Sequence, residues 1–133
     1  MLREIIESIN ESAKLNGREI KKLMSGLGAK LIGQTRKGGK FKGFTPEVHG
    51  NVIDVYEIGK LIVVLEKPSN DYYLKVFTEK PKPDMFTKMW NHDSQTTEGT
   101  KILKYSEKIK GYSVRRPKDY NPEELSKYIN DNK

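Results

Sequence analysis

Residues 35–44 hold the residue types that bind phosphate groups, arranged around three glycines. Glycine lets backbone amides approach a phosphate closely, and lysine and arginine side chains neutralise its charge. Phe41 and Phe44 have rings that can stack on unpaired bases. The alternative is a solvated hairpin tip whose phenylalanines point into the core. The candidate nucleic-acid-binding residues of this segment are Arg36, Lys37, Lys40, Phe41 and Lys42.

A second cationic block covers residues 100–118, which contain seven lysines and arginines and one acid. Residues 29–44 contain five cations and no acid, whereas the rest of the chain has an excess of acids. Charge that is segregated in this way attracts polyanions. Pro117 favours an extended cationic arm along a nucleic-acid backbone, or else a solvated connection before the last helix. The candidate binding residues here are Arg115, Arg116 and Lys118.

The phosphate-binding loop of P-loop nucleotide hydrolases is excluded by its spacing. That motif needs a glycine, four residues, and then Gly-Lys followed by serine or threonine. Gly33 and Gly38 have the required separation, but Gly39 stands where the lysine should be. Lys40 is followed by Phe41 instead of a hydroxyl residue.

Catalytic and metal-binding residue types are sparse. His49 and His92 are the only histidines, so one chain cannot supply a three-histidine metal site. His92, Asp93 and Glu98 lack the i, i+4 spacing of helical zinc motifs. No serine has the Gly-x-Ser-x-Gly signature of a strained nucleophile turn. We therefore expect no metal and no cofactor.

Asp54 lies between Ile53 and Val55 in an apolar segment, which predicts that its carboxylate is partly buried. A buried aspartate either pairs with a neighbour, such as a lysine on the next strand, or acts as a tuned acid or base. Pairing is the commoner of the two.

The elements that must position these residues begin with helices at both ends. Residues 2–9 have apolar positions at i, i+3, i+4 and i+7, which predicts an amphipathic helix. Asn16 is a suitable cap for a second helix, with Glu19 as its capping-box partner. Asn121 and Pro122 are typical of the start of a C-terminal helix.

Alternating patterns between these helices predict an antiparallel sheet. Residues 30–44 form a hairpin with a basic tip, and residues 52–65 form a second, clearer hairpin. The arm at 61–65 is apolar on both faces and belongs in the centre of the sheet. Residues 72–78 add a further strand, and the prolines near 81–83 end it and supply a candidate hinge.

The remaining segments are less regular. Residues 91–100 are polar and predict an exposed loop, whereas residues 102–114 have features of both a helix and a strand. The fold class is therefore α+β, in a single domain over residues 1–133. It is an antiparallel β-meander of three to five strands with an N-terminal helical pair and a C-terminal helix.

One face of the strand at 72–78 presents Tyr73, Lys75 and Phe77. Together with Tyr56, this face is similar to a platform on which single strands stack. The alternative is that helices cover the face, and the N-terminal pair is available for that role.

The predicted order of elements is two helices followed by a β-meander, and the chain has a net positive charge. In both respects it resembles small RNA-cleaving toxins of the RelE-like kind. The resemblance is topological, covers roughly residues 1–80, and includes no shared residue motif. It implies a metal-independent ribonuclease, here with His49 or His92 and nearby cations.

Composition sets the remaining limits. The chain has no cysteine, which excludes disulfides and thiolate metal sites and favours a reducing compartment. Its longest apolar run, residues 61–65, is far shorter than the ~20 residues of a membrane span. We expect a cytoplasmic protein without a membrane partner that binds RNA or single-stranded DNA. The alternatives are the ribonuclease and a host-directed inhibitor that binds an acidic protein surface.

Overall fold

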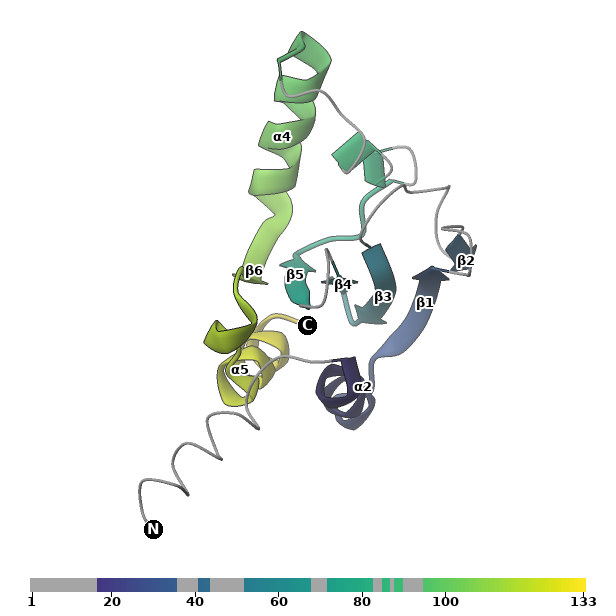
Figure 1. Cartoon of the computed structure of the whole chain (residues 1–133), viewed down its shortest axis with the longest axis vertical. Coiled ribbons are helices and arrows are strands. Elements are labelled where there is room, and N and C mark those ends of the chain that lie inside the picture. Colours follow the sequence, from purple (N-terminus) through teal and green to yellow (C-terminus); the bar gives the residue numbers. More distant parts are fainter. Residues whose placement is uncertain are drawn as a thin grey trace.

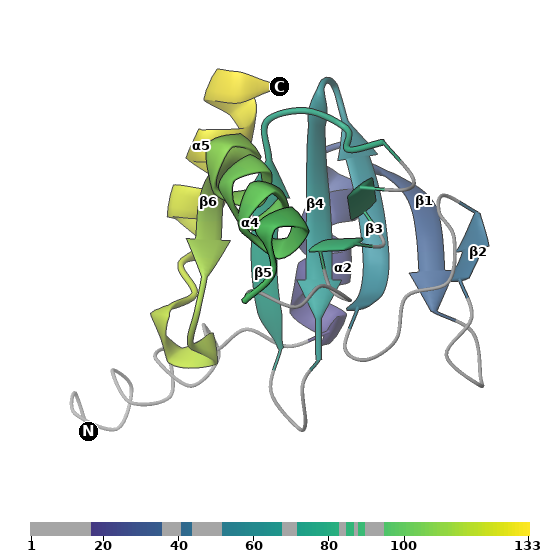
Figure 2. The same ribbon diagram turned by 90° about the horizontal axis from the view of Figure 1, so that it is seen from above.

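The fold is α+β, with one antiparallel sheet and helices on both of its faces (Figures 1 and 2). The computed structural model describes residues 17–35, 41–43, 52–67, 72–82, 85–86, 88–89 and 95–133. Its elements are α2 (Gly17–Gly26), β1 (Lys30–Thr35), β2 (Phe41–Gly43), β3 (Val52–Ile58), β4 (Leu61–Glu66), β5 (Tyr73–Phe77), α4 (Thr97–Ile109), β6 (Lys110–Val114), a 3-10 helix (Pro117–Asp119) and α5 (Pro122–Asn132).

The strands lie in the order β2-β1-β3-β4-β5-β6, and every neighbouring pair is antiparallel. The predicted hairpin at 30–44 is confirmed by the pairing of β1 with β2, and that at 52–65 by the pairing of β3 with β4. From β3 to β6 the strands form a meander. Five strands have five to seven residues and β2 has three, so the described sheet has six strands, one more than the predicted maximum of five.

β4 is an interior strand because its side chains are apolar in both directions. Val63 and Leu65 pack on the face covered by α2 and α5, whereas Ile62 and Val64 pack on the face covered by α4. Figure 2 shows α4 on one side of the sheet and α2 on the other. The prediction of a central strand buried on both faces is confirmed.

The helix boundaries follow recognisable end signals. α2 ends before Gly28, whose positive φ of 76° suits a residue without a side chain. Asn121 caps α5, and its side chain accepts hydrogen bonds from the amides of Glu123 and Glu124 at 3.0 and 3.1 Å. The predicted C-terminal helix is confirmed. The first helix of the predicted N-terminal pair, at residues 2–9, lies outside the described residues.

The ambiguous stretch at 102–114 contains both of the structures that its sequence suggested. α4 ends at Ile109 and β6 begins at the next residue. The predicted loop at 91–100 is wrong for its last four residues, which form the first turn of α4. The reason is a cap: the Thr96 hydroxyl accepts a hydrogen bond from the Gly99 amide at 2.9 Å.

A short helical stretch at 85–86 and 88–89 precedes α4. Phe86 and Met89 are buried there and belong to the core cluster on the α4 face. The candidate hinge near 81–83 is described only for its first two residues and stays a prediction. None of the helices in the described part of the chain has the length and apolar character needed to cross a membrane.

Candidate nucleic-acid interface

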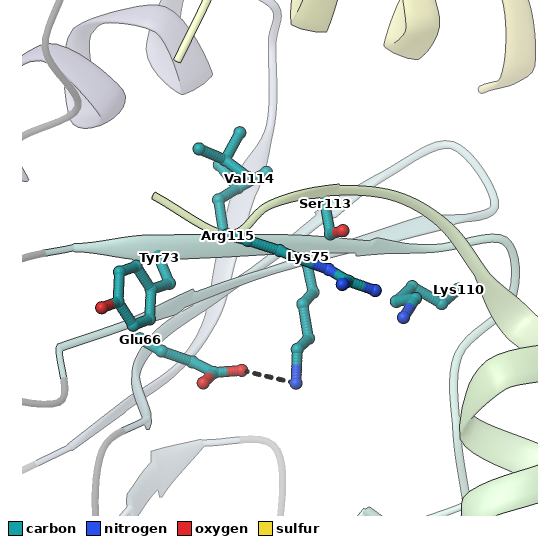
Figure 3. Close-up of a pocket in the computed structure, with 8 residues that line it drawn as sticks. Glu66, Tyr73, Lys75, Lys110, Ser113, Val114 and Arg115 are labelled. Atoms are coloured by element: carbon teal, nitrogen blue, oxygen red, sulfur yellow. Dashed lines mark ion pairs between the residues drawn. The ribbon is translucent and has the colours of Figure 1, made fainter. Parts of the chain in front are cut away.

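A shallow pocket of about 180 Å³ lies where β5 meets the edge strand β6 (Figure 3). Figure 3 shows three cationic side chains beside it, with the Arg115 side chain directed toward Lys110. The polar residues that line the pocket are Glu66 from β4, Tyr73 and Lys75 from β5, Lys110 and Ser113 from β6, and Arg115 just after β6.

Strand register explains why these side chains share one face. Lys75 pairs with Ser113 across β5 and β6, and Glu66 pairs with Tyr73 across β4 and β5. Directly opposed residues of an antiparallel ladder project to the same side. The alternate residues, such as Leu74 and Val114, project to the other side and are buried under α2 and α5. The polar residues are therefore left on the pocket face.

Lys110 joins this face because of a β-bulge. Val76 pairs with Tyr112, but the next residue, Phe77, pairs with Lys110, so that Gly111 is left between the two pairs. Without this extra residue, strict alternation would place Lys110 on the opposite face. A side chain at Gly111 would collide with the hydroxyl of Tyr128 on α5, so the bulge fits closely against that helix.

Two of the three cations have carboxylate partners. Lys75 Nζ lies 3.2 Å from Glu66 Oε1, and Lys110 Nζ lies 3.0 Å from Glu107 Oε1. The hydrogen bond and charge of Lys110, followed by the charges of Arg115 and Lys75, lower the pKa of Glu107. All three cations therefore act on one small region. Within the described part of the chain, Arg115 forms no ion pair.

A stripe of lysines on α4 leads toward the pocket. Lys101, Lys104 and Lys108 are exposed and follow the i, i+3, i+7 spacing of one helix face. Ile102 and Ile109 are buried on the inner side of the same helix. The stripe ends two residues before Lys110, so α4 extends the cationic surface beyond the pocket.

The two candidate residues of the glycine-rich segment that the structure describes, Phe41 and Lys42, are not brought to this pocket. Arg36, Lys37 and Lys40 lie outside the described residues. Phe41 and Lys42 belong to β2, at the opposite edge of the sheet from β6. At a strand spacing of ~4.8 Å, the two edges are ~24 Å apart.

Of the two interpretations of residues 115–118, the extended cationic arm is wrong, and the solvated connection before the last helix is the one observed. Pro117 begins a 3-10 helix, and Arg116 Nε lies 2.7 Å from Asp119 Oδ2 on the far side of this turn. Lys118 is exposed on the same turn. Of the three candidates in this block, only Arg115 lines the pocket.

Of the four residues of the predicted stacking platform, only Tyr73 and Lys75 are accessible on the pocket face. Phe77 is fully buried on the α4 face, and Tyr56 belongs to the cluster on the other face of the sheet. The cover over Phe77 comes from α4 and from Phe86 and Met89, whereas α2 packs on the other face of the sheet. Tyr73 and Lys75 remain half-buried beside the pocket.

Three lining residues were missed as site residues: Glu66, Lys110 and Ser113. The sequence marks Lys110 only as part of a charged block, because a bulge cannot be recognised from an alternating pattern. The one available signal was Gly111, since a glycine inside a strand often marks a bulge.

Among the described residues, no cluster of three or more potential metal ligands is present. His49, His92 and Asp93 lie outside that set, and Glu98 pairs with Lys88 at 2.8 Å. Asp54 is buried as predicted, with 1% exposure. Its Oδ1 accepts a hydrogen bond from Gln34 at 3.1 Å, so the predicted lysine partner is wrong.

No protein-family model matches this chain, and no curated protein and no solved structure matches it. Function is therefore inferred from the residues and their geometry.

Proposed function

We propose that this is a small basic protein that binds RNA or single-stranded DNA, with the pocket between β5 and β6 as a backbone contact. The observation that supports this most is the convergence of Lys75, Lys110 and Arg115 on one pocket face. Phosphate groups bind where lysine and arginine donors converge, and Ser113 adds a hydroxyl donor. The glycine-rich segment at 35–44 is proposed as a second contact on sequence grounds.

The contribution of neighbouring surfaces is electrostatic. The α4 lysine stripe would attract a polyanion along the helix, and Tyr73 offers a ring edge or face next to the phosphate position. Such contacts are tolerant of sequence, since every strand has phosphates and every base has a π face. We expect binding with little sequence preference and a strong salt dependence.

A matched pair of arginine variants tests this proposal. Arg115→Gln and Arg116→Gln remove the same charge from adjacent positions, but only Arg115 lines the pocket. Fluorescence anisotropy of a labelled single-stranded oligonucleotide, measured over a range of salt concentrations, gives affinity and salt slope. Arg115→Gln should weaken binding by roughly 10- to 100-fold, since a charged hydrogen bond contributes ~1.5–3 kcal/mol. It should also lower the salt slope by about one.

Arg116→Gln should have a much smaller effect, because its guanidinium pairs with Asp119. Equal losses for the two variants would indicate a diffuse field and not a pocket. Absence of binding at low salt would contradict nucleic-acid binding altogether, and would favour the acidic protein surface as the partner.

A second candidate is metal-independent RNA cleavage. It is favoured by one observation, the presence of the Glu66 carboxylate in the same pocket as three cations. A carboxylate can move a proton while cations stabilise charge that develops on a phosphate. Incubation of the protein with labelled RNA in the presence of EDTA tests this, and intact RNA after prolonged incubation would rule it out.

A further inference from the structure

We propose that the pocket accepts one internal phosphodiester of a continuous strand, and that it discriminates against terminal phosphates and free nucleotides. This inference rests on the proposed nucleic-acid binding and names the chemical class of group that the pocket would take. It follows from the charges that surround the pocket, the position of Glu66, and the size of the opening.

The net charge of the side chains at the pocket matches a ligand with a single negative charge. Lys75, Lys110 and Arg115 supply three positive charges, and Glu66 and Glu107 supply two negative ones. One positive charge remains. An internal phosphodiester carries one negative charge, whereas a phosphate monoester carries ~1.5 to 2 at neutral pH. A diester is therefore neutralised by the pocket, and a monoester leaves an excess of negative charge.

Glu66 opposes the binding of the second negative charge of a phosphate monoester. Its side chain is only 12% exposed, and its Oε1 atom is buried next to Lys75 with no hydrogen bond. A buried carboxylate is poorly screened by solvent, so it repels a second negative charge in the pocket more strongly than an exposed one would. Figure 3 shows Glu66 beside Tyr73 and paired with Lys75.

Arg115 provides geometry suited to a diester. Its side chain is exposed and reaches across the pocket toward Lys110 in Figure 3. A guanidinium group can donate two parallel hydrogen bonds, which fits the two non-bridging oxygens of a diester. Lys75 and Lys110 line the same pocket and act as point charges.

The size of the pocket supports the same assignment. Its volume of about 180 Å³ is smaller than the ~300–1,000 Å³ of sites that enclose a small molecule. A whole nucleotide would not be enclosed, whereas a backbone phosphate with its flanking sugars outside would fit. The strand could leave the pocket past Tyr73 in one direction and along the lysine stripe of α4 in the other.

The experiment compares oligonucleotides of one sequence that carry either a 5′-hydroxyl or a 5′-phosphate, each labelled at the 3′ end. Anisotropy titrations of the unmodified protein should give affinities that agree within about twofold, because internal diesters occupy the pocket in both. Adenosine monophosphate at a large excess over protein should leave binding unchanged.

Two carboxylate variants extend the test. Glu66→Gln removes the buried charge and should favour the 5′-phosphorylated strand by about threefold or more. Glu107→Gln removes an equal charge from a side chain that is 59% exposed and therefore screened by solvent. It should strengthen binding of both strands and favour the 5′-phosphorylated strand by clearly less than Glu66→Gln does. Circular dichroism spectra of both variants check that the fold is retained.

The outcomes separate the two proposals. If the unmodified protein binds the 5′-phosphorylated strand about tenfold more tightly, or if adenosine monophosphate competes, the diester assignment is overturned while nucleic-acid binding stands. If neither strand binds at low salt, the proposed function itself fails. Because the unmodified protein decides both points, the result does not depend on the variants.

Discussion

At the scale of single residues, Asp54 is a buried carboxylate of which only one oxygen has a hydrogen-bond partner. Its Oδ1 atom has Gln34 as a donor, whereas its Oδ2 atom is buried with no hydrogen-bond partner. A buried polar atom without a partner costs about 1–3 kcal/mol, and a charged atom costs more. Asp54 therefore lowers the stability of the sheet between β1 and β3.

Replacing Asp54 with asparagine should stabilise the protein. The amide oxygen can still accept the hydrogen bond from Gln34, while the unpaired charge is removed. We expect the free energy of unfolding at neutral pH to rise by about 1 kcal/mol in urea denaturation. Asp119→Asn, which alters an exposed ion pair, serves as the control and should change stability by less than ~0.5 kcal/mol. A loss of stability in Asp54→Asn would mean that Oδ2 has a stabilising partner.

The candidate site shows how far residue types alone can be interpreted. Arg115 was identified from charge density, and it lies in the pocket. Arg116 has the same charge and the next position, yet it pairs with Asp119 in a turn. Charge density cannot separate the two, because the difference comes from the 3-10 helix after β6 and not from the residues themselves.

At the scale of elements, the junction of α4 and β6 decides the composition of the site. The sequence suggested both a helix and a strand at 102–114 without showing where one gives way to the other. The structure places the change at Lys110 and the bulge at Gly111. Both depend on tertiary contacts with β5 and with Tyr128 on α5, which a local pattern does not contain.

Gly111→Ala tests the bulge. The added methyl group would collide with Tyr128 and lie 2.9 Å from Thr78 Cγ2, so either α5 or β6 must shift. We expect a loss of about 1–3 kcal/mol in unfolding free energy. Gly26→Ala is the matched control, because a methyl group there meets nothing within 4 Å. If Gly111→Ala were as well tolerated as the control, the close fit of the bulge against α5 would be contradicted.

At the scale of the whole molecule, the α+β class, the central strand and the Asn121 cap of α5 could be predicted from sequence. Hydrophobic alternation and caps are local signals, and they gave β3, β4 and α5 correctly. The arrangement of helices over the sheet is not local. The sequence favoured the N-terminal pair as the cover over Phe77, but α4 occupies that face.

The strand order also changes how the two cationic blocks must be viewed. Lys42 of the first block lies in β2 and Lys110 of the second block lies in β6. These two strands form opposite edges of the sheet, so the two residues do not share one compact patch. A strand that contacted both edges would have to cross four strands. Each block is therefore better tested separately, with salt slopes measured for variants of one block at a time.

The pocket joins parts of the chain that are distant in sequence, and this has a consequence for its motions. β6 pairs with β5 only after α4 has intervened, with 31 residues separating Thr78 from Ile109. A ligand that contacts both Lys75 and Arg115 binds only while these strands remain paired, so it opposes their local separation. Amide hydrogen exchange in β6 should slow when a saturating oligonucleotide is added, whereas exchange in α2 should change little. Equal slowing in both elements would indicate that the ligand stabilises the molecule as a whole and not the edge of the sheet.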